Sequence, residues 1–242
     1  MTRQELERVS ARRLAGSALY VAAWPALMFA LAGDIGWLEG WICAGWLVGL
    51  YATITIWMYL KAPALLAERH RRPQSEDATT GRGREQSGAD RIAVMLLFLG
   101  FAMWIVLMPL DARRFGWTLG FPLSVKVAGG ALLLLSAFLL FRAFRDNTFL
   151  SGAARIQSDR QQRVVSTGVY AFVRHPMYLG IVLMFAGTPL LLGSQAGLAI
   201  AVAVTLVLAV RIVGEERLLT SGLEGYAEYC RTVRYRLLPF VW

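Results

Sequence analysis

The chain has 242 residues, of which 57% are hydrophobic and 17% are charged, and its net charge at pH 7 is +9. Its mean hydropathy is positive, +0.50. These values exclude an ordinary soluble domain, in which about 25% of the residues are charged. We therefore predict an all-α, polytopic integral membrane protein.

A helix of about 20 apolar residues crosses the hydrocarbon core of a bilayer. The sequence contains six such windows and so predicts about six transmembrane helices, at roughly residues 14–33, 41–60, 92–110, 121–141, 177–193 and 195–213. The last two windows flank Gly193 and Ser194, so we expect a helical hairpin there. The first window has an alternative interpretation as a signal peptide, but its length and Pro25 favour a resident helix.

The basic residues follow the predicted spans rather than indicating a nucleic-acid partner. All but three of the 25 Lys and Arg residues lie in the N-terminal segment, the second and fourth connections, and the C-terminal tail. The exceptions are Arg113, Arg114 and Lys126. Because Lys and Arg concentrate in cytoplasmic segments, we predict that both termini are cytoplasmic. The expected location is a bacterial inner membrane or its equivalent.

The two halves of the chain differ in the segments that connect their spans. Residues 1–141 hold the first four spans, and their connection at 62–91 is polar, Gly-rich and without apolar periodicity. This composition predicts a flexible cytoplasmic loop. Residues 142–242 hold the last two spans together with cytoplasmic segments in which apolar residues recur, so we expect these segments to be folded.

Two short amphipathic helices are expected in this second region. Gly168 predicts a turn, and the apolar residues after it indicate a short amphipathic helix. The sixth span should continue as helix past Glu216, turn near Ser221 and be followed by a second amphipathic helix. Pro239 is expected to end that helix.

The string VRHPMYLG, residues 173–180, lies where a cytoplasmic segment enters the fifth span. Pro176 suits the first position of a helix, whose free amide groups can hold an anionic group such as a carboxylate. Arg174 and His175 would lie beside that group, and Gly180 would admit a ligand or another helix. The residues alone leave an alternative open, in which Arg174 anchors the helix to lipid headgroups and Gly180 only packs.

Two adjacent acids, Glu215 and Glu216, follow the sixth span. An acid near the C-terminal end of a helix gains nothing from the helix dipole and therefore needs a partner. A ligand with ribose hydroxyls or a cationic sulfonium is one such partner, and ion pairs with Arg211 or Arg217 are the alternative.

The tail contributes a basic and aromatic cluster. Aromatic faces bind a sulfonium or stack on adenine, and Arg binds phosphate or carboxylate. Interfacial anchoring explains the cluster equally well. Its members are Tyr226, Tyr229, Arg231, Arg234, Tyr235 and Arg236.

Several motifs follow one another in the last 100 residues or so. They are NTFLSGAARI from Asn147, VSTGVY (165–170), RHPMYLG, an apolar hairpin, EERLL (215–219), YAEY (226–229) and a terminal LLP. In this order they resemble the isoprenylcysteine carboxyl methyltransferases and their bacterial relatives, which are similar to phospholipid N-methyltransferases.

The resemblance implies a membrane-embedded methyltransferase whose cofactor, S-adenosylmethionine, binds among the C-terminal helices. The implied cofactor-binding residues are Val165, Gly168, Tyr170, His175, Pro176, Tyr178, Gly180, Glu215 and Glu216. His175, Arg174 and Arg234 are implied for catalysis or substrate orientation, with His175 as the base if one is used. No metal is expected, because methyl transfer from a sulfonium depends on positioning the acceptor.

The methyl acceptor is left open by two departures from the family pattern. Val169 follows Gly168 where relatives have Pro, and no His follows the Asn147 element. The expected partners are S-adenosylmethionine, membrane lipids and a lipophilic or small acceptor bearing a carboxylate, thiol or amine. The alternatives are a sterol-reductase-like enzyme that uses NADPH and a noncatalytic membrane protein.

Overall fold

The computed structural model describes residues 11–62, 65–66, 81–150 and 161–242, and within these ranges the chain is helical and contains no strand. The long helices are α2 (Ala11–Ala32), α3 (Leu38–Lys61), α5 (Gly81–Pro109), α6 (Leu123–Asp146), α7 (Pro176–Leu192) and α8 (Gln195–Gly222). Three short helices complete the described parts: a π-helix, η2 (Leu110–Arg114), a 3-10 turn, η4 (Gly168–Ala171), and α9 (Tyr226–Thr232). The predicted all-α class is confirmed.

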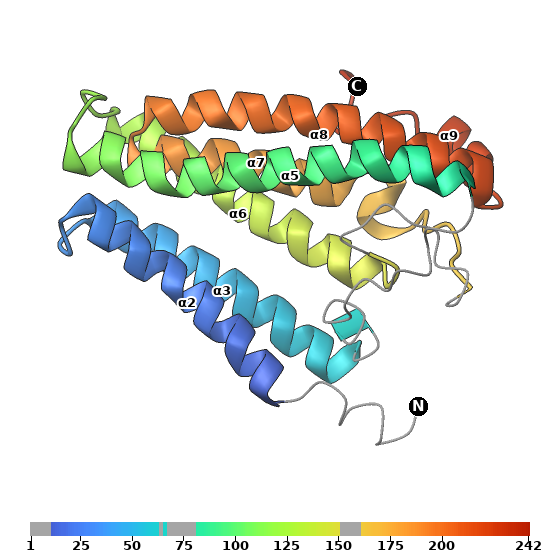
Figure 1. The fold of residues 1–242 in the computed structure, drawn as a ribbon, viewed down its shortest axis with the longest axis horizontal. Coiled ribbons are helices and arrows are strands. Elements are labelled where there is room, and N and C mark those ends of the chain that lie inside the picture. The colour runs from blue at the N-terminus through green and yellow to red at the C-terminus, as the bar shows by residue number, and fades with distance from the viewer. Residues whose placement is uncertain (1–10, 63–64, 67–80, 151–160) are drawn as a thin grey trace.

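The helices run alongside one another in an elongated bundle (Figure 1). Helix α6 packs extensively on α7, and α5 lies along α8. Helices α2 and α3 form a hairpin that touches the other helices less extensively. The 3-10 turn η4 and helix α9 gather at one end of the bundle, beside the beginning of α7 and the end of α8 (Figure 1).

Glycines let α6 and α7 approach at backbone distance. A Cβ atom on Gly129 would lie 2.5 Å from the Leu191 nitrogen, and one on Gly187 would lie 2.9 Å from the Gly129 carbonyl oxygen. The Ser136 hydroxyl donates a hydrogen bond of 2.7 Å to the Gly180 carbonyl across the same interface. Small residues therefore fix the position of α7, whose N-terminal end carries the predicted site.

A buried carboxylate joins the helices at the other end of the bundle. Asp111 accepts hydrogen bonds from the Ser194 hydroxyl at 2.7 Å and the Ala196 amide at 3.0 Å. It also accepts from the Thr118 amide and hydroxyl, each at 2.9 Å. Gly193 ends α7 with a φ of 83°. The predicted hairpin of the last two spans is thus present, and Asp111 binds its turn to η2.

Four segments are long and apolar enough to cross a membrane: Leu38–Lys61, Asp90–Arg114, Leu123–Asp146 and Gln195–Gly222. The segment Val21–Ala32 and helix α7 are apolar but shorter. Large apolar side chains are exposed on the helices, as at Phe98, Leu134 and Leu206, which are 69%, 71% and 64% exposed. Such surfaces match a lipid environment.

Three expectations for the connecting segments were wrong. Helix α5 already begins at Gly81, so residues 81–91 are helical rather than part of the loop expected at 62–91. Residues 63–64 and 67–80 of that expected loop lie outside the described residues. The helix expected after Gly168 is only the 3-10 turn η4.

The third error concerns the tail. Helix α9 ends at Thr232 and not at Pro239. The non-helical backbone beyond it is held by the residues just before α7, because the Arg174 and His175 amides donate to the Tyr235 and Arg236 carbonyls, both at 2.9 Å. These tertiary hydrogen bonds compete with further helix formation.

Candidate active site at one end of the bundle

The site is organised by the first turn of α7. Pro176 occupies the first helical turn as predicted, and His175 is the residue that precedes the helix. The backbone amides of Arg174 and His175 donate to the carbonyls of the tail, so residues 174–175 and 235–236 lie side by side. The side chains of Arg174 and His175 are both buried and both turn toward the end of α8.

Glu216 on α8 is the centre of a buried ionic cluster with Arg174, His175 and Arg236, which we call the Glu216 cluster. The carboxylate accepts from Arg174 Nε at 2.6 Å and from Arg236 Nε at 2.7 Å. His175 Nε2 lies 3.2 Å from the same carboxylate. Since two guanidinium groups contact one carboxylate, the charge of Glu216 is compensated within the protein.

Arg174 also binds the backbone of the tail. Its Nη1 donates to the Val233 carbonyl at 2.7 Å and to the Arg234 carbonyl at 3.0 Å. Burial alone would lower the pKa of Arg174, but the hydrogen bond and charge of Glu216 raise it above the usual value. Arg174 therefore joins α7, α8 and the tail into one frame.

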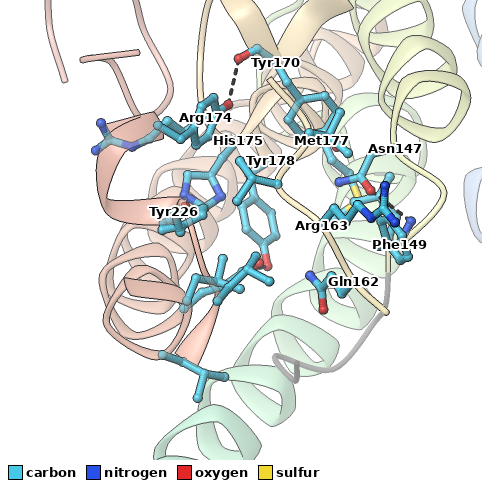
Figure 2. A pocket seen from close by; sticks show the side chains of 18 residues that line it. Asn147, Phe149, Gln162, Arg163, Tyr170, Arg174, His175, Met177, Tyr178 and Tyr226 are labelled. Carbon is cyan, nitrogen blue, oxygen red and sulfur yellow. Dashed lines mark hydrogen bonds between the residues drawn. The ribbon is translucent and has the colours of Figure 1, made fainter. Parts of the chain in front are cut away.

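A polar pocket opens beside this frame. Figure 2 shows His175, Tyr178 and Tyr226 on one side of it, and Asn147, Phe149 and Arg163 on the other. The complete lining is Asn147, Phe149, Leu150, Gln162, Arg163, Val164, Val165, Tyr170, Arg174, His175, Met177, Tyr178, Glu215, Leu218, Leu219, Leu223, Tyr226 and Tyr229.

Tyr178 and Glu215 form one wall of the polar pocket. The Tyr178 hydroxyl donates a hydrogen bond of 2.7 Å to Glu215 Oε2. The His175 ring stacks on the Tyr178 ring, with a centroid distance of 5.6 Å and an interplanar angle of 27°. The two adjacent acids thus have different surroundings, because Glu216 lies inside the buried cluster and Glu215 faces the pocket.

Tyr170 brings an unsatisfied polar group to the pocket. Its hydroxyl is buried and makes no hydrogen bond within the described residues, although the Asn147 side chain lies close to it. The backbone of Tyr170 is fixed, because its carbonyl accepts from the Tyr229 hydroxyl at 2.7 Å. Burial raises the pKa values of Tyr170 and Tyr229, so both hydroxyls keep their proton at neutral pH.

The turn that carries Tyr170 is held by Asp146 at the end of α6. Asp146 Oδ2 accepts from the Val169 amide at 3.0 Å and from Arg142 Nη2 at 3.0 Å. Gly168 has a φ of 63°, and a Cβ atom there would fall on the Asp146 carboxylate. Gly168 therefore shapes the pocket through its backbone conformation.

A second cavity, which we call the apolar groove, adjoins the polar pocket. Met177 and Tyr178 line both. Apart from Tyr178 and Arg211, the residues that line the groove are apolar and come from α5, α6, α7 and α8: Val94, Leu97, Phe98, Phe101, Leu140, Phe144, Met177, Ile181, Met184, Phe185, Val204 and Leu208. A polar and an apolar cavity thus meet at one point of α7.

The structure gathers only some of the predicted site residues around the pocket. The residues that line it are Val165, Tyr170, Arg174, His175, Tyr178 and Glu215. Gly180 instead packs on α6, because a Cβ atom there would lie 2.8 Å from Leu140 Cγ. Pro176 begins α7, and Glu216 holds the frame. The Arg234 residue is exposed, and its carbonyl binds Arg174.

Sequence reasoning missed three contributors to the site. Arg236 was noted only as part of a basic cluster, yet it contacts Glu216. Asp146 had no motif to indicate that it holds the Gly168 turn. The third contributor is Asp90 on α5. Arg211 Nε contacts it at 2.9 Å, whereas the sequence suggested that Arg211 pairs with the adjacent glutamates. Only the charge of Asp90 at the start of an apolar window was visible in the sequence.

Comparisons with known proteins show what the sequence is similar to. The sequence model of the phospholipid methyltransferase family matches residues 125–224, which include most of α6 and all of η4, α7 and α8. Two plant proteins, Protein-S-isoprenylcysteine O-methyltransferases B and A of Arabidopsis thaliana, are each 29% identical to the chain, over 152 and 153 residues. Each similarity covers 62% of this chain and 73% of the relative.

These similarities confirm the predicted class of the protein, an enzyme of the methyltransferase type with a membrane-embedded helical fold. By their names the two plant relatives are isoprenylcysteine methyltransferases, and the order of the motifs predicted a resemblance to proteins of this kind. The individual site residues are not assigned by the comparisons and stay predictions.

Proposed function

We propose that the protein transfers a methyl group from S-adenosylmethionine to a lipophilic acceptor at the cytoplasmic face of the membrane. The observation that carries this proposal is the meeting of two unlike cavities at Met177 and Tyr178. A polar donor and an apolar acceptor would each find a matching environment there. Bringing reactants together in the correct orientation supplies much of the catalysis in such a transfer.

The polar pocket offers the groups that the donor requires. Glu215 is a carboxylate that faces the pocket and suits ribose hydroxyls or the positive sulfonium. The buried Tyr170 hydroxyl has a hydrogen bond to give, and a ligand would satisfy it. When bound, S-adenosylmethionine supplies a methyl group that is activated by its sulfonium. Val165, Tyr178 and His175 complete the donor wall.

Binding of the donor requires the pocket to widen. Its interior space is about 90 Å³, whereas small-molecule sites have about 300 Å³ or more. The walls come from separate segments, with Asn147 after α6, Val165 before η4 and Tyr226 on α9. We expect these segments to move apart around the donor while the Glu216 cluster stays in place.

The apolar groove is proposed to hold the chain of the acceptor. Its interior space is about 460 Å³, which falls within the range of ligand sites. A carboxylate acceptor needs no base, whereas a thiol or a protonated amine must lose a proton. His175 lines the polar pocket and is the histidine proposed for that step. We place Arg174 in the frame, since its donors already bind Glu216 and the tail.

The proposed membrane arrangement has six spans and places both termini in the cytoplasm. The four long helices would span the membrane together with α2 and α7, the latter paired with α8 in a hairpin. The distribution of Lys and Arg supports this orientation. It places the polar pocket on the side of the membrane where S-adenosylmethionine is made.

The test is calorimetric titration of the purified protein in nanodiscs with S-adenosylhomocysteine and, separately, with NADPH. We expect S-adenosylhomocysteine to bind and NADPH not to bind. In a separate assay with S-adenosylmethionine as the donor, we expect methyl transfer to an S-prenylated cysteine or a long-chain acceptor, with release of S-adenosylhomocysteine. Binding of NADPH alone would replace the proposal with a reductase. Binding of neither would indicate a noncatalytic protein.

Two tyrosine variants locate the donor. Tyr170→Phe removes a hydroxyl that has no partner within the described residues, so affinity for S-adenosylhomocysteine should fall about tenfold without a loss of stability. Tyr229→Phe is the matched control. It removes the hydrogen bond to the Tyr170 carbonyl and should lower stability by about 1 kcal/mol. Equal donor affinity in Tyr170→Phe and the wild type would contradict the proposed pocket.

A further inference from the structure

The apolar groove has a charged pair at one end. Arg211 on α8 lines the groove, and its Nε donates to Asp90 Oδ1 on α5 at 2.9 Å. The side chains of Arg211 and Asp90 are 10% and 21% exposed, so the pair is shielded from water. Among the described residues that line the groove, Arg211 is the single charged one.

This pair adjoins the point where the groove meets the polar pocket. The Arg211 guanidinium carbon lies 5.8 Å from the centre of the Tyr178 ring, and Tyr178 lines both cavities. The chain of an amphiphile in the groove would therefore end with its head group near Arg211. The charge that the head group meets depends in part on Asp90, because the Asp90 carboxylate pairs directly with the guanidinium.

We infer that Asp90 is a specificity-determining residue of the acceptor groove, which limits the binding of anionic head groups by neutralising Arg211. An anionic amphiphile must compete with the Asp90 carboxylate for the guanidinium, whereas a neutral or cationic one need not. This inference rests on the proposed function, since it takes the groove as the acceptor site. Asp90 lies outside residues 125–224, the part that matches the methyltransferase family. The N-terminal half of the chain thus sets a property of a site that the C-terminal half builds.

The test compares dodecanoate and dodecylamine, which have the same chain and opposite head-group charges. Their affinities are measured by calorimetry in nanodiscs of zwitterionic lipid, without a methyl donor. In Asp90→Asn the loss of the paired carboxylate should raise the ratio of dodecanoate to dodecylamine affinity about tenfold, because a partly buried charge acts at short range through a low effective dielectric. Asp90→Glu should keep the wild-type ratio.

Glu39→Gln is the matched control. Glu39 on α3 pairs with Lys126 Nζ on α6 at 2.6 Å, with side-chain exposures of 25% and 26%, and neither residue lines the groove. Like Asp90→Asn, this variant removes one negative charge, but it should leave the affinity ratio unchanged. It therefore controls for partitioning of the amphiphiles into lipid. An equal shift in both variants would show a nonspecific charge effect and overturn the inference.

Further variants keep the inference testable if Asp90→Asn does not fold. Arg211→Gln leaves Asp90 uncompensated and should lower the ratio about tenfold by the same argument. The double variant Asp90→Asn with Arg211→Gln removes both charges and should restore the wild-type ratio. Val94→Trp fills the groove and should weaken both amphiphiles, whereas unchanged binding would place them elsewhere and overturn the inference.

The two proposals fail in different ways. If the wild type binds the amphiphiles with the expected ratios but transfers no methyl group, the proposed function fails and the groove assignment stands. If methyl transfer occurs but Asp90→Asn keeps the wild-type ratio in a folded protein, the role of Asp90 is refuted while the enzyme activity stands.

Discussion

The adjacent residues Glu215 and Glu216 have different surroundings because their side chains lie on different sides of α8. Glu216 is buried and accepts from Arg174, Arg236 and His175, whereas Glu215 is partly exposed and accepts from the Tyr178 hydroxyl. A buried ion pair contributes little net stability, but removing one partner leaves a costly unpaired charge. Burial thus decides which acid supports the frame and which faces the polar pocket.

The pair gives a matched test. Glu216→Gln should destabilise the protein by about 3–5 kcal/mol, because Arg174 would stay buried without its carboxylate. Glu215→Gln should change stability by less than about 1 kcal/mol and should weaken S-adenosylhomocysteine binding. Thermal unfolding in detergent and calorimetry separate the two effects. Equal stabilities of the two variants would contradict the assignment of Glu216 to the frame.

At the scale of elements, the position of α7 depends on its contact with α6. Glycines at this contact allow backbone groups to meet, so α7 is held at a fixed depth and its first turn reaches the end of α8. Interhelical contacts of this kind are typical of membrane proteins, where small residues replace the hydrophobic driving force. Gly180, expected to bind a ligand, serves this contact.

Two neighbouring glycines of α6 test the interface. Gly129→Ala should destabilise the protein by about 1–3 kcal/mol, because the new methyl group would lie 2.5 Å from the Leu191 nitrogen. Gly130→Ala meets no atom within 4 Å and should stabilise by up to about 1 kcal/mol through helix propensity. Unfolding measured on both variants decides between this packing and a loosely packed pair of helices.

At the scale of the whole molecule, the end of α8 and helix α9 lie at one end of the bundle, and the turn between α7 and α8 lies at the other (Figure 1). The first of these ends contributes to the polar pocket, and the second holds the Asp111 contacts. The pocket end also contains α9 and the C-terminal residues, where Arg231, Arg234 and Arg236 are found. Arg113 lies at the opposite end, where it pairs with Asp34. The proposed activity therefore requires the end of the bundle that contains the pocket to face the cytoplasm.

Reporter fusions test that orientation. Fusions after Trp242 and at residues 75–80 should be cytoplasmic, because the basic residues concentrate on their side of the predicted spans. Reporters inserted near Gly36 or Gly120 should be on the opposite side. A fusion after Trp242 that lies outside the cytoplasm would separate the pocket from its proposed donor.

The sequence by itself determined the helical membrane class, the positions of the apolar helices and the resemblance to methyltransferases. These properties depend on local composition and on the order of motifs, as in RHPMYLG and EERLL. The helical start at Pro176 and the hairpin turn at Gly193 were also predictable, because Pro and Gly act through their own backbone conformations.

Only the tertiary structure decided which residues meet. The pairing of Glu216 with Arg236, the support of the Gly168 turn by Asp146 and the pairing of Asp90 with Arg211 join residues on different elements. The same holds for the tail, where hydrogen bonds from Arg174 and His175 hold residues 235–236 in a non-helical conformation. Composition and spacing report local preferences, whereas the partner of a charge or a backbone amide depends on how the helices pack.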